Sequence, residues 1–181
     1  MQLKKVLLFL LFGTALQGFS QITSAQSGNW SDGSTWTGGI IPQSSDDVTI
    51  SNGHNVTVNG NFSCQHLILN GYSTSTVFSV NSPNTLDCVR FDVWASGSNQ
   101  SVSIANSGDL NVTSLFYVWD NNRNNFVVTL GGIGTTYISG RTLFQGNRNT
   151  TTVNVNQKLT VDGEFYLASV GGFNVQANVT D

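Results

Sequence analysis

The sequence predicts an all-β fold, a parallel β-helix of about 24 residues per coil that begins with an N-terminal cap. Three observations lead to this prediction. Short segments alternate apolar and polar residues with a period of two, which is typical of strands with one buried face. Asn, Gly, Ser and Asp, which favour turns, separate these segments, and the segments recur at a fixed spacing along the chain.

Composition sets limits on the function. The chain has 181 residues, of which 9% are charged, against about 25% in a typical soluble domain. Hydrophobic residues make up 39% of the chain and include 11 Phe and 4 Trp, so it has enough apolar surface for a core. Charge-driven disorder is therefore not expected. With 7 Lys and Arg in total, binding of nucleic acid through a basic surface is not expected either.

Residues 1–20 have the pattern of a secretory signal peptide. Lys4 and Lys5 precede seven apolar residues at 6–12, and small residues follow at Gly18 and Ser20. A membrane anchor is the alternative, but a span needs about 20 apolar residues, and Gln17 interrupts this one. We expect cleavage before Gln21, or after Ala25, and no membrane span in the mature chain. Loss of the two lysines would leave 5 basic and 10 acidic residues.

The strand-like segments divide the mature chain into a cap with the first strands at residues 21–55 and coils at residues 56–181. Ten triplets carry the alternation: 48–50, 56–58, 67–69, 78–80, 91–93, 102–104, 110–112, 153–155, 159–161 and 173–175. No window of a dozen residues shows the apolar spacing of a helix.

Overlaying the segments gives the length of one coil. Residues 78–94 overlay residues 102–119 at an offset of 24 that rises to 25, and residues 62–69 overlay 86–93 at 24. Residues 110–112 and 116–118 meet 159–161 and 165–167 at 49, which is two coils. The overlay stacks Trp94 on Trp119. An antiparallel β-sandwich is the alternative. It would need hairpin turns throughout the chain, whereas Asn-Gly pairs occur only at residues 52–53, 59–60 and 70–71, in the N-terminal third.

The residues before the first coil fit a cap, because a solenoid must cover the hydrophobic end of its first coil. Trp30 and Trp36 are predicted to cover that end. The turn into the first strand is assigned to Gly38, Gly39 and Pro42, with Asp46 or Asp47 accepting backbone N–H groups there.

Residues 22–58, ITSAQSGNWSDGSTWTGGIIPQSSDDVTISNGHNVTV, carry a resemblance to a known family. They resemble the opening module of secreted surface proteins of Gram-negative bacteria with a type IX secretion system, and the eight-glycine domain. The matching positions are Trp30, Trp36, Gly38, Gly39, Pro42, Asp46, Asp47, Val48, Ile50, Gly53, His54, Val56 and Val58. The resemblance implies a right-handed parallel β-helix on the cell surface or released from it. Such proteins usually end in a sorting domain, whereas this chain stops at Asp181 inside a repeat, so we expect a truncated solenoid.

No constellation of residues predicts catalysis, a metal site or a cofactor. Asp46 and Asp47 are adjacent, so their side chains would point to opposite faces of a strand. The overlay places Asp87 beside Asn111 and Asp92 beside Tyr117, so neither carboxylate stacks on a second acid of the kind a lyase or glycosidase needs. The two histidines, His54 and His66, lack partners at metal-ligand spacing.

The expected function is therefore a non-catalytic, structural or adhesive module of a secreted or cell-surface protein. A carbohydrate-binding or carbohydrate-active β-helix protein is the alternative, with Tyr117, Trp119, Asn121 and Arg123 as candidate glycan contacts. The expected partners are extracellular polysaccharides or other surface proteins. End-to-end self-association is also expected, because an open coil leaves a strand edge that can pair with another chain.

Cys64 and Cys88 are the only cysteines and lie one repeat apart. Stacked residues of neighbouring coils are about 4.8 Å apart, within the Cα separation of about 4.4–6.8 Å that disulfides use. We expect the pair to be stacked and to face the core. Whether it is a disulfide or two buried thiols is left open.

Overall fold

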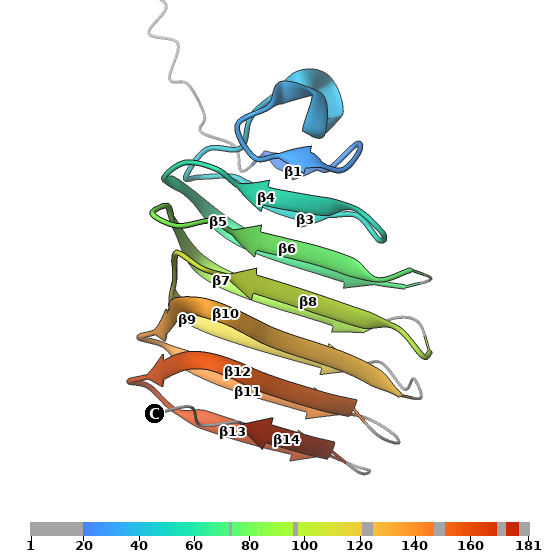
Figure 1. Cartoon of the computed structure of the whole chain (residues 1–181), viewed down its shortest axis with the longest axis vertical. Coiled ribbons are helices and arrows are strands. Elements are labelled where there is room, and N and C mark those ends of the chain that lie inside the picture. Colours follow the sequence, from blue (N-terminus) through green and yellow to red (C-terminus); the bar gives the residue numbers. More distant parts are fainter. Residues whose placement is uncertain are drawn as a thin grey trace, which may run out of the picture.

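The chain is a parallel β-solenoid of about five turns with about 25 residues per turn (Figure 1). The computed structural model describes residues 20–72, 74–95, 98–120, 125–146, 151–169 and 173–177. Every pairing between its named strands is parallel, and the ladder connects all 14 of them. The predicted fold class is confirmed, and the antiparallel sandwich is excluded.

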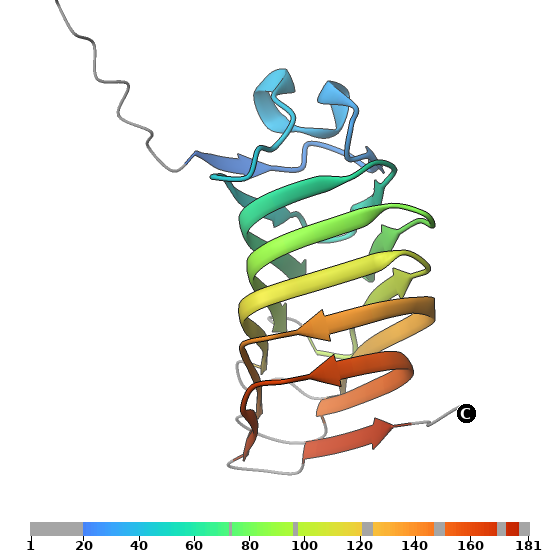
Figure 2. The same ribbon diagram turned by 90° about the vertical axis from the view of Figure 1, so that its left-hand side faces the viewer.

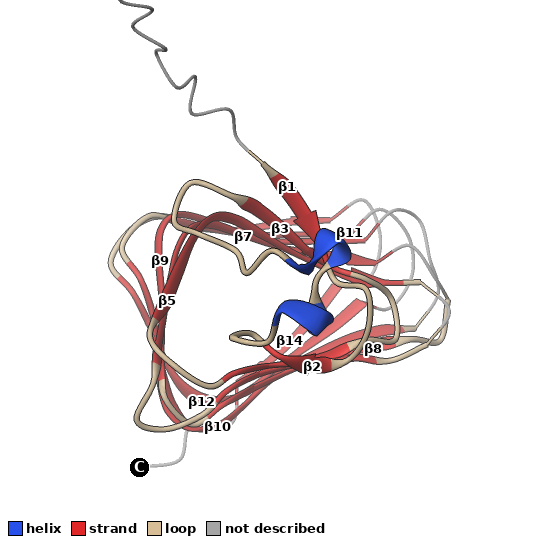
Figure 3. Cartoon of the chain, turned by 90° about the horizontal axis from the view of Figure 1, so that it is seen from above, coloured by secondary structure: helices blue, strands red, loops and turns tan. Residues whose placement is uncertain are grey.

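Each full coil turns three corners, so the solenoid has three faces and a roughly triangular outline when seen along its axis (Figure 3). Face 1 contains β1 (Gln21–Thr23), β3 (Asp47–Ile50), β11 (Arg141–Gly146), β13 (Phe165–Ser169) and the second parts of β5 (Phe62–Gly71), β7 (Thr85–Ala95) and β9 (Asp109–Asp120). Face 2 contains β2 (Gly28–Asn29), β4 (Asn55–Val58), β6 (Thr76–Val80), β8 (Ser101–Asn106), β14 (Phe173–Ala177) and the first parts of β10 (Phe126–Ile138) and β12 (Thr151–Val161). Face 3 stacks the first parts of β5, β7 and β9 on the second parts of β10 and β12.

The register agrees with most of the sequence overlay and corrects one part of it. Leu86 pairs with Leu110 and Phe91 with Phe116, at the predicted offsets of 24 and 25. On face 2, however, Phe78 pairs with Ile104 rather than with Val102, so the offset there is 26. The reason lies in the next corner: residues 81–84 connect β6 to β7, but only residues 107–108 connect β8 to β9. The second corner is two residues shorter than the first, so the offset returns from 26 on face 2 to 24 at the start of β7 and β9.

Alternation along the strands buries one side chain in two and builds a continuous apolar core. A ladder of aromatic rings follows the solenoid axis, with centroids 6.0 Å apart for Phe78 and Phe91, 5.3 Å for Phe91 and Phe116, and 5.8 Å for Phe116 and Phe144. Edge-to-face and tilted pairs of this kind stabilise a core beyond the area that they bury. At the last described coil, the inward positions Phe165 and Leu167 are 46% and 56% exposed.

Two tryptophans cover the other end of the core. Trp30 and Trp36 are buried, and their rings meet edge to face at 5.0 Å. The Trp36 indole N–H donates to the Trp30 carbonyl (2.8 Å), and Trp30 packs against Phe62 and Phe78. Two short 3₁₀ turns, Gly33–Thr35 and Thr37–Gly39, carry the chain over this end (Figure 2).

The segments before β3 and β4 contain three glycines with positive φ angles, a buried proline and an aspartate that closes a turn. Gly38, Gly39 and Gly53 have φ values of 79°, 74° and 77°, which favour glycine. Pro42 is buried. Asp46 accepts the backbone N–H of Gln43 at 2.7 Å, so it closes the turn, whereas Asp47 is the first residue of β3.

Corners of the solenoid require glycine where backbones of neighbouring coils approach closely. A Cβ atom on Gly134 would lie 2.2 Å from the Gly108 carbonyl oxygen, far inside van der Waals contact. Gly131, three residues earlier on the same strand, has only Thr129 Cγ2 nearby, at 3.9 Å. The two glycines therefore provide a matched pair of sites.

We expect Gly134→Ala to destabilise the protein by about 1–3 kcal/mol, because the methyl group overpacks the corner. Gly131→Ala should instead leave stability unchanged or raise it by up to about 1 kcal/mol, since alanine restricts the unfolded chain. Urea unfolding followed by circular dichroism measures both. Equal unfolding free energies for the two variants would contradict the close stacking of Gly108 and Gly134.

Candidate functional site

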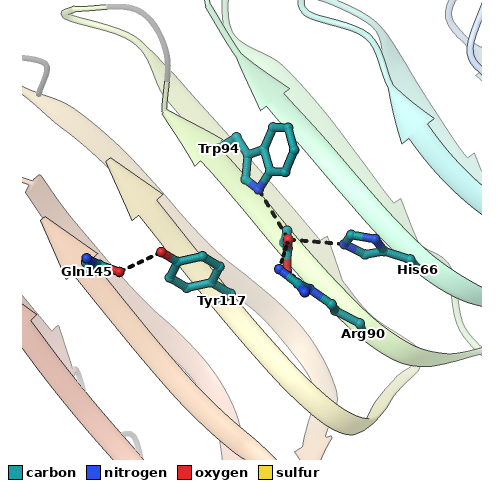
Figure 4. A network of polar contacts seen from close by, with 6 residues as sticks. His66, Arg90, Trp94, Tyr117 and Gln145 are labelled. Carbon is teal, nitrogen blue, oxygen red and sulfur yellow. Dashed lines mark hydrogen bonds and ion pairs between the residues drawn. The ribbon is translucent and has the colours of Figure 1, made fainter. Parts of the chain in front are cut away.

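Outward side chains of face 1 form three columns that run along the solenoid axis. The parallel register stacks each residue on its equivalent in the next coil. We call this surface the aromatic–polar face, and its central rows are His66, Ile68 and Asn70 on β5; Arg90, Asp92 and Trp94 on β7; Leu115, Tyr117 and Trp119 on β9; and Arg141, Leu143 and Gln145 on β11. Part of it is drawn in Figure 4.

Asp92 is the centre of a polar network on this face, and its side chain is 0% exposed. Arg90 donates to it twice, from Nε to Oδ1 at 2.8 Å and from Nη2 to Oδ2 at 2.7 Å. The Trp94 indole N–H donates to Oδ2 at 3.2 Å, and His66 Nε2 of the preceding coil lies 3.1 Å from the same oxygen (Figure 4). One carboxylate thus accepts hydrogen bonds from two larger side chains and contacts a third.

These contacts keep Asp92 ionised. Burial by itself would raise the pKa of the carboxyl group, but the contact with His66 and the hydrogen bonds and positive charge of Arg90 outweigh it, so the pKa lies below its usual value. The hydrogen bond from Asp92 in turn raises the pKa of Arg90. A general base needs access to its substrate and a pKa near the working pH. Asp92 has no exposed surface and a lowered pKa, so its role is to position its neighbours.

The next coils add aromatic rings and a second hydrogen-bonded pair. Trp94 and Trp119 meet edge to face, with ring centroids 6.2 Å apart. The Tyr117 hydroxyl donates to Gln145 Oε1 at 2.6 Å, which fixes the phenol ring and the amide (Figure 4). Burial, followed by the charge of Asp92, raises the pKa of Tyr117, so its hydroxyl stays protonated and able to donate.

Two open depressions lie beside the column formed by His66, Arg90, Leu115 and Arg141. One, of about 270 Å³, is lined by Asp47, Gln65, His66 and Arg90. The other, of about 440 Å³, is lined by Ser114, Leu115, Gly140, Arg141, Gly163 and Glu164. Arg141 pairs with Glu164 (3.0 Å), and its guanidinium lies 5.4 Å from the centroid of the Tyr166 ring.

The structure places two of the four candidate glycan contacts on this face. Tyr117 and Trp119 are neighbours there, while Asn121 and Arg123 lie outside the described residues. Asp92 lies beside Tyr117, as the overlay indicates. Asp87 lies beside Asn111, whose amide donates to it at 2.8 Å.

Sequence reasoning missed the network around Asp92. It compared each acid with the residue of the next coil and looked for a second acid, so it did not consider basic and aromatic neighbours on the same strand. The signal was present: Phe91 and Val93 point inward, so Arg90, Asp92 and Trp94 must share the outer surface. The 24-residue offset also places His66 beside Arg90.

Cys64 and Cys88 are register partners on adjacent strands, and both are buried free thiols. Their Sγ atoms are 3.4 Å apart. Burial, together with the contact to Cys64, raises the pKa of Cys88 well above its usual value, so the thiol is a poor nucleophile at neutral pH. The pair packs as part of the core.

No protein-family model, curated protein or solved structure matches the chain. The structure establishes the β-solenoid fold but assigns no family. Across the described segments, no three His, Cys, Asp or Glu side chains gather as metal ligands. No helix among the described residues has the length and apolar character needed to cross a bilayer.

We expect Asp92→Asn to destabilise the protein by about 1–3 kcal/mol at neutral pH, because it leaves buried donors without an ionised acceptor. The folded-state pKa of Asp92 lies below the unfolded value of 3.8, so its stabilisation is present above pH 3.8 and is lost below it, as the pH falls through the folded-state pKa. Urea unfolding between pH 7 and about pH 2 should therefore show the two proteins converging in acid. Asp87→Asn, at an exposed carboxylate, serves as the control. If the unfolding free energies of wild type and Asp92→Asn differed by the same amount at all pH values, Asp92 would not be the ionised, stabilising group of this network.

Proposed function

We propose that the chain is a non-catalytic module of an exported surface or extracellular protein of a Gram-negative bacterium, with a structural or adhesive role. The export part rests on the signal pattern of residues 1–20 and on the resemblance of residues 22–58 to modules of type IX secretion proteins. A rigid, capped solenoid suits such a role, because it displays long flat faces on a core that needs no ligand.

The observation that carries the non-catalytic part is the state of Asp92. It is the carboxylate at the centre of the most developed polar cluster among the described residues, and its oxygens are occupied by Arg90, Trp94 and His66. A carboxylate with a low pKa and no exposed surface cannot take a proton from a substrate. The cluster supports a role in presenting a surface.

A second candidate function, carbohydrate binding, is favoured by the aromatic–polar face. Half-buried tryptophan and tyrosine rings beside fixed amide and guanidinium groups are the side chains that recognise sugars, through stacking on the ring and hydrogen bonds to the hydroxyls. This candidate is compatible with the first, since adhesion to a polysaccharide is one form of an adhesive role.

Turnover assays test the proposal. We expect the full chain, incubated for many hours with neutral and acidic polysaccharides, to release neither reducing ends nor unsaturated ends, because the cluster lacks a free base. Expression with the native leader in a Gram-negative host should also give a protein cleaved before Gln21 or after Ala25, as read by mass spectrometry. Release of reducing or unsaturated ends would refute the non-catalytic role, and an uncleaved cytoplasmic chain would refute export.

A further inference from the structure

We infer that the aromatic–polar face binds a linear, uncharged polysaccharide that lies along the solenoid axis, with sugar rings over Trp94 and Trp119. The inference deepens the proposed adhesive function and rests on it. Four features of the described residues carry it: the rigidity of the polar groups, the balance of charge, the direction of the columns and the pairing of the backbone.

The polar groups are held in position before any ligand arrives. Asp92 fixes Arg90 and the Trp94 indole through hydrogen bonds of 2.7–3.2 Å, and Gln145 is fixed by the Tyr117 hydroxyl at 2.6 Å. Arg90 uses Nε and Nη2 for Asp92 and remains 41% exposed, so its guanidinium can still donate outward. Preorganised donors lose little conformational entropy on binding, which matters for ligands whose hydroxyls already bond well to water.

Charge on the face points to an uncharged ligand. Both arginines that the structure describes on this face are paired with a carboxylate, Arg90 with Asp92 and Arg141 with Glu164. Asp47, which lines the depression next to His66 and Arg90, adds a negative charge. A face without net positive charge does not attract an acidic polymer, whereas it can still bond to neutral hydroxyls.

The columns of stacked side chains on face 1 run along the solenoid axis, so they favour a linear ligand that lies in the same direction. Equivalent side chains repeat at the strand spacing of about 4.8 Å along the axis, and Trp94, Trp119 and Gln145 succeed one another in one column. Beside them, the column with His66, Arg90 and Leu115 holds the two open depressions. A linear chain lying along the axis would contact both columns over several coils, so its affinity should rise with its length.

The backbone makes an extended peptide a poor occupant. The central strands of face 1 pair on both sides with neighbouring coils, as β7 does with β5 and β9. They therefore leave no free edge for strand addition, the mode by which sheets commonly capture peptides. The ligand must be recognised by side chains alone, and the side chains present there are aromatic rings, a guanidinium, an imidazole and amides.

Native affinity electrophoresis of the full chain tests the inference, with soluble polysaccharides cast in the gel. The neutral probes are xyloglucan, galactomannan and hydroxyethylcellulose, and the acidic probes are alginate, polygalacturonate and carboxymethylcellulose. Hydroxyethylcellulose and carboxymethylcellulose share a backbone and differ in charge. We expect at least one neutral probe to retard the protein, more strongly at higher chain length, and raising the salt from about 0.05 to 0.5 M to leave the Kd within about twofold.

Substitutions locate the site. Trp119→Ala should raise the Kd about tenfold, whereas Trp119→Phe, which keeps a stacking ring, should recover most of the affinity. Tyr137→Ala removes an outward aromatic ring on face 3 and should leave binding unchanged. Circular dichroism and urea unfolding confirm that each variant is folded.

Three results would overturn the inference: no retardation by any neutral probe, binding only to acidic probes with loss at high salt, or equal affinity of wild type and Trp119→Ala. Each of these leaves the non-catalytic module intact, because turnover and export are measured separately. Conversely, release of sugar ends would overturn the module's proposed role and leave the binding result standing.

Discussion

The spacing of the backbone hydrogen bonds between coils is the constraint on which the rest of this structure depends. Parallel pairing holds each strand about 4.8 Å from the next, so every side chain lies directly over its equivalent one coil away. Inside, the register stacks Phe91 on Phe116, whose rings lie tilted at 5.3 Å. Phe78 and Phe144 come from other register positions and meet these two rings edge to face, because flat stacking is disfavoured. At the corners it requires glycine, as at Gly108 and Gly134.

The same spacing explains how a buried carboxylate is tolerated on an outer face. Asp92 could not hold its charge without water if its strand stood alone, because desolvation is costly. Arg90 and Trp94 lie two residues away on the same side of β7, and the register adds His66 from β5. Alternation along the strand and stacking between strands together supply the donors, so the ion is stable there and orders the residues around it.

Sequence periodicity was sufficient for the fold class, the coil length and the pairing of Cys64 with Cys88, because these depend on which residues alternate and at what offset. It was not sufficient for the register of face 2, where Phe78 pairs with Ile104, because corner lengths of residues 81–84 and 107–108 leave no mark on the strand pattern. For the candidate site, Tyr117 and Trp119 were singled out by their chemistry, and the structure shows that they share one face. Arg90, Asp92, Trp94 and His66 were not, because their importance comes from neighbours on two strands considered together.

The corners of this solenoid differ in length from one coil to the next, while the strands on its faces stay in register. Two residues gained at one bend are removed at the next, so the extra length never reaches the faces. A change of length at one bend is therefore tolerated where the next bend compensates it and the close backbone contacts at glycine corners are kept. The surface columns, in contrast, depend on particular side chains at particular heights. The corners can therefore differ in length from coil to coil, while the surface columns keep one height per coil.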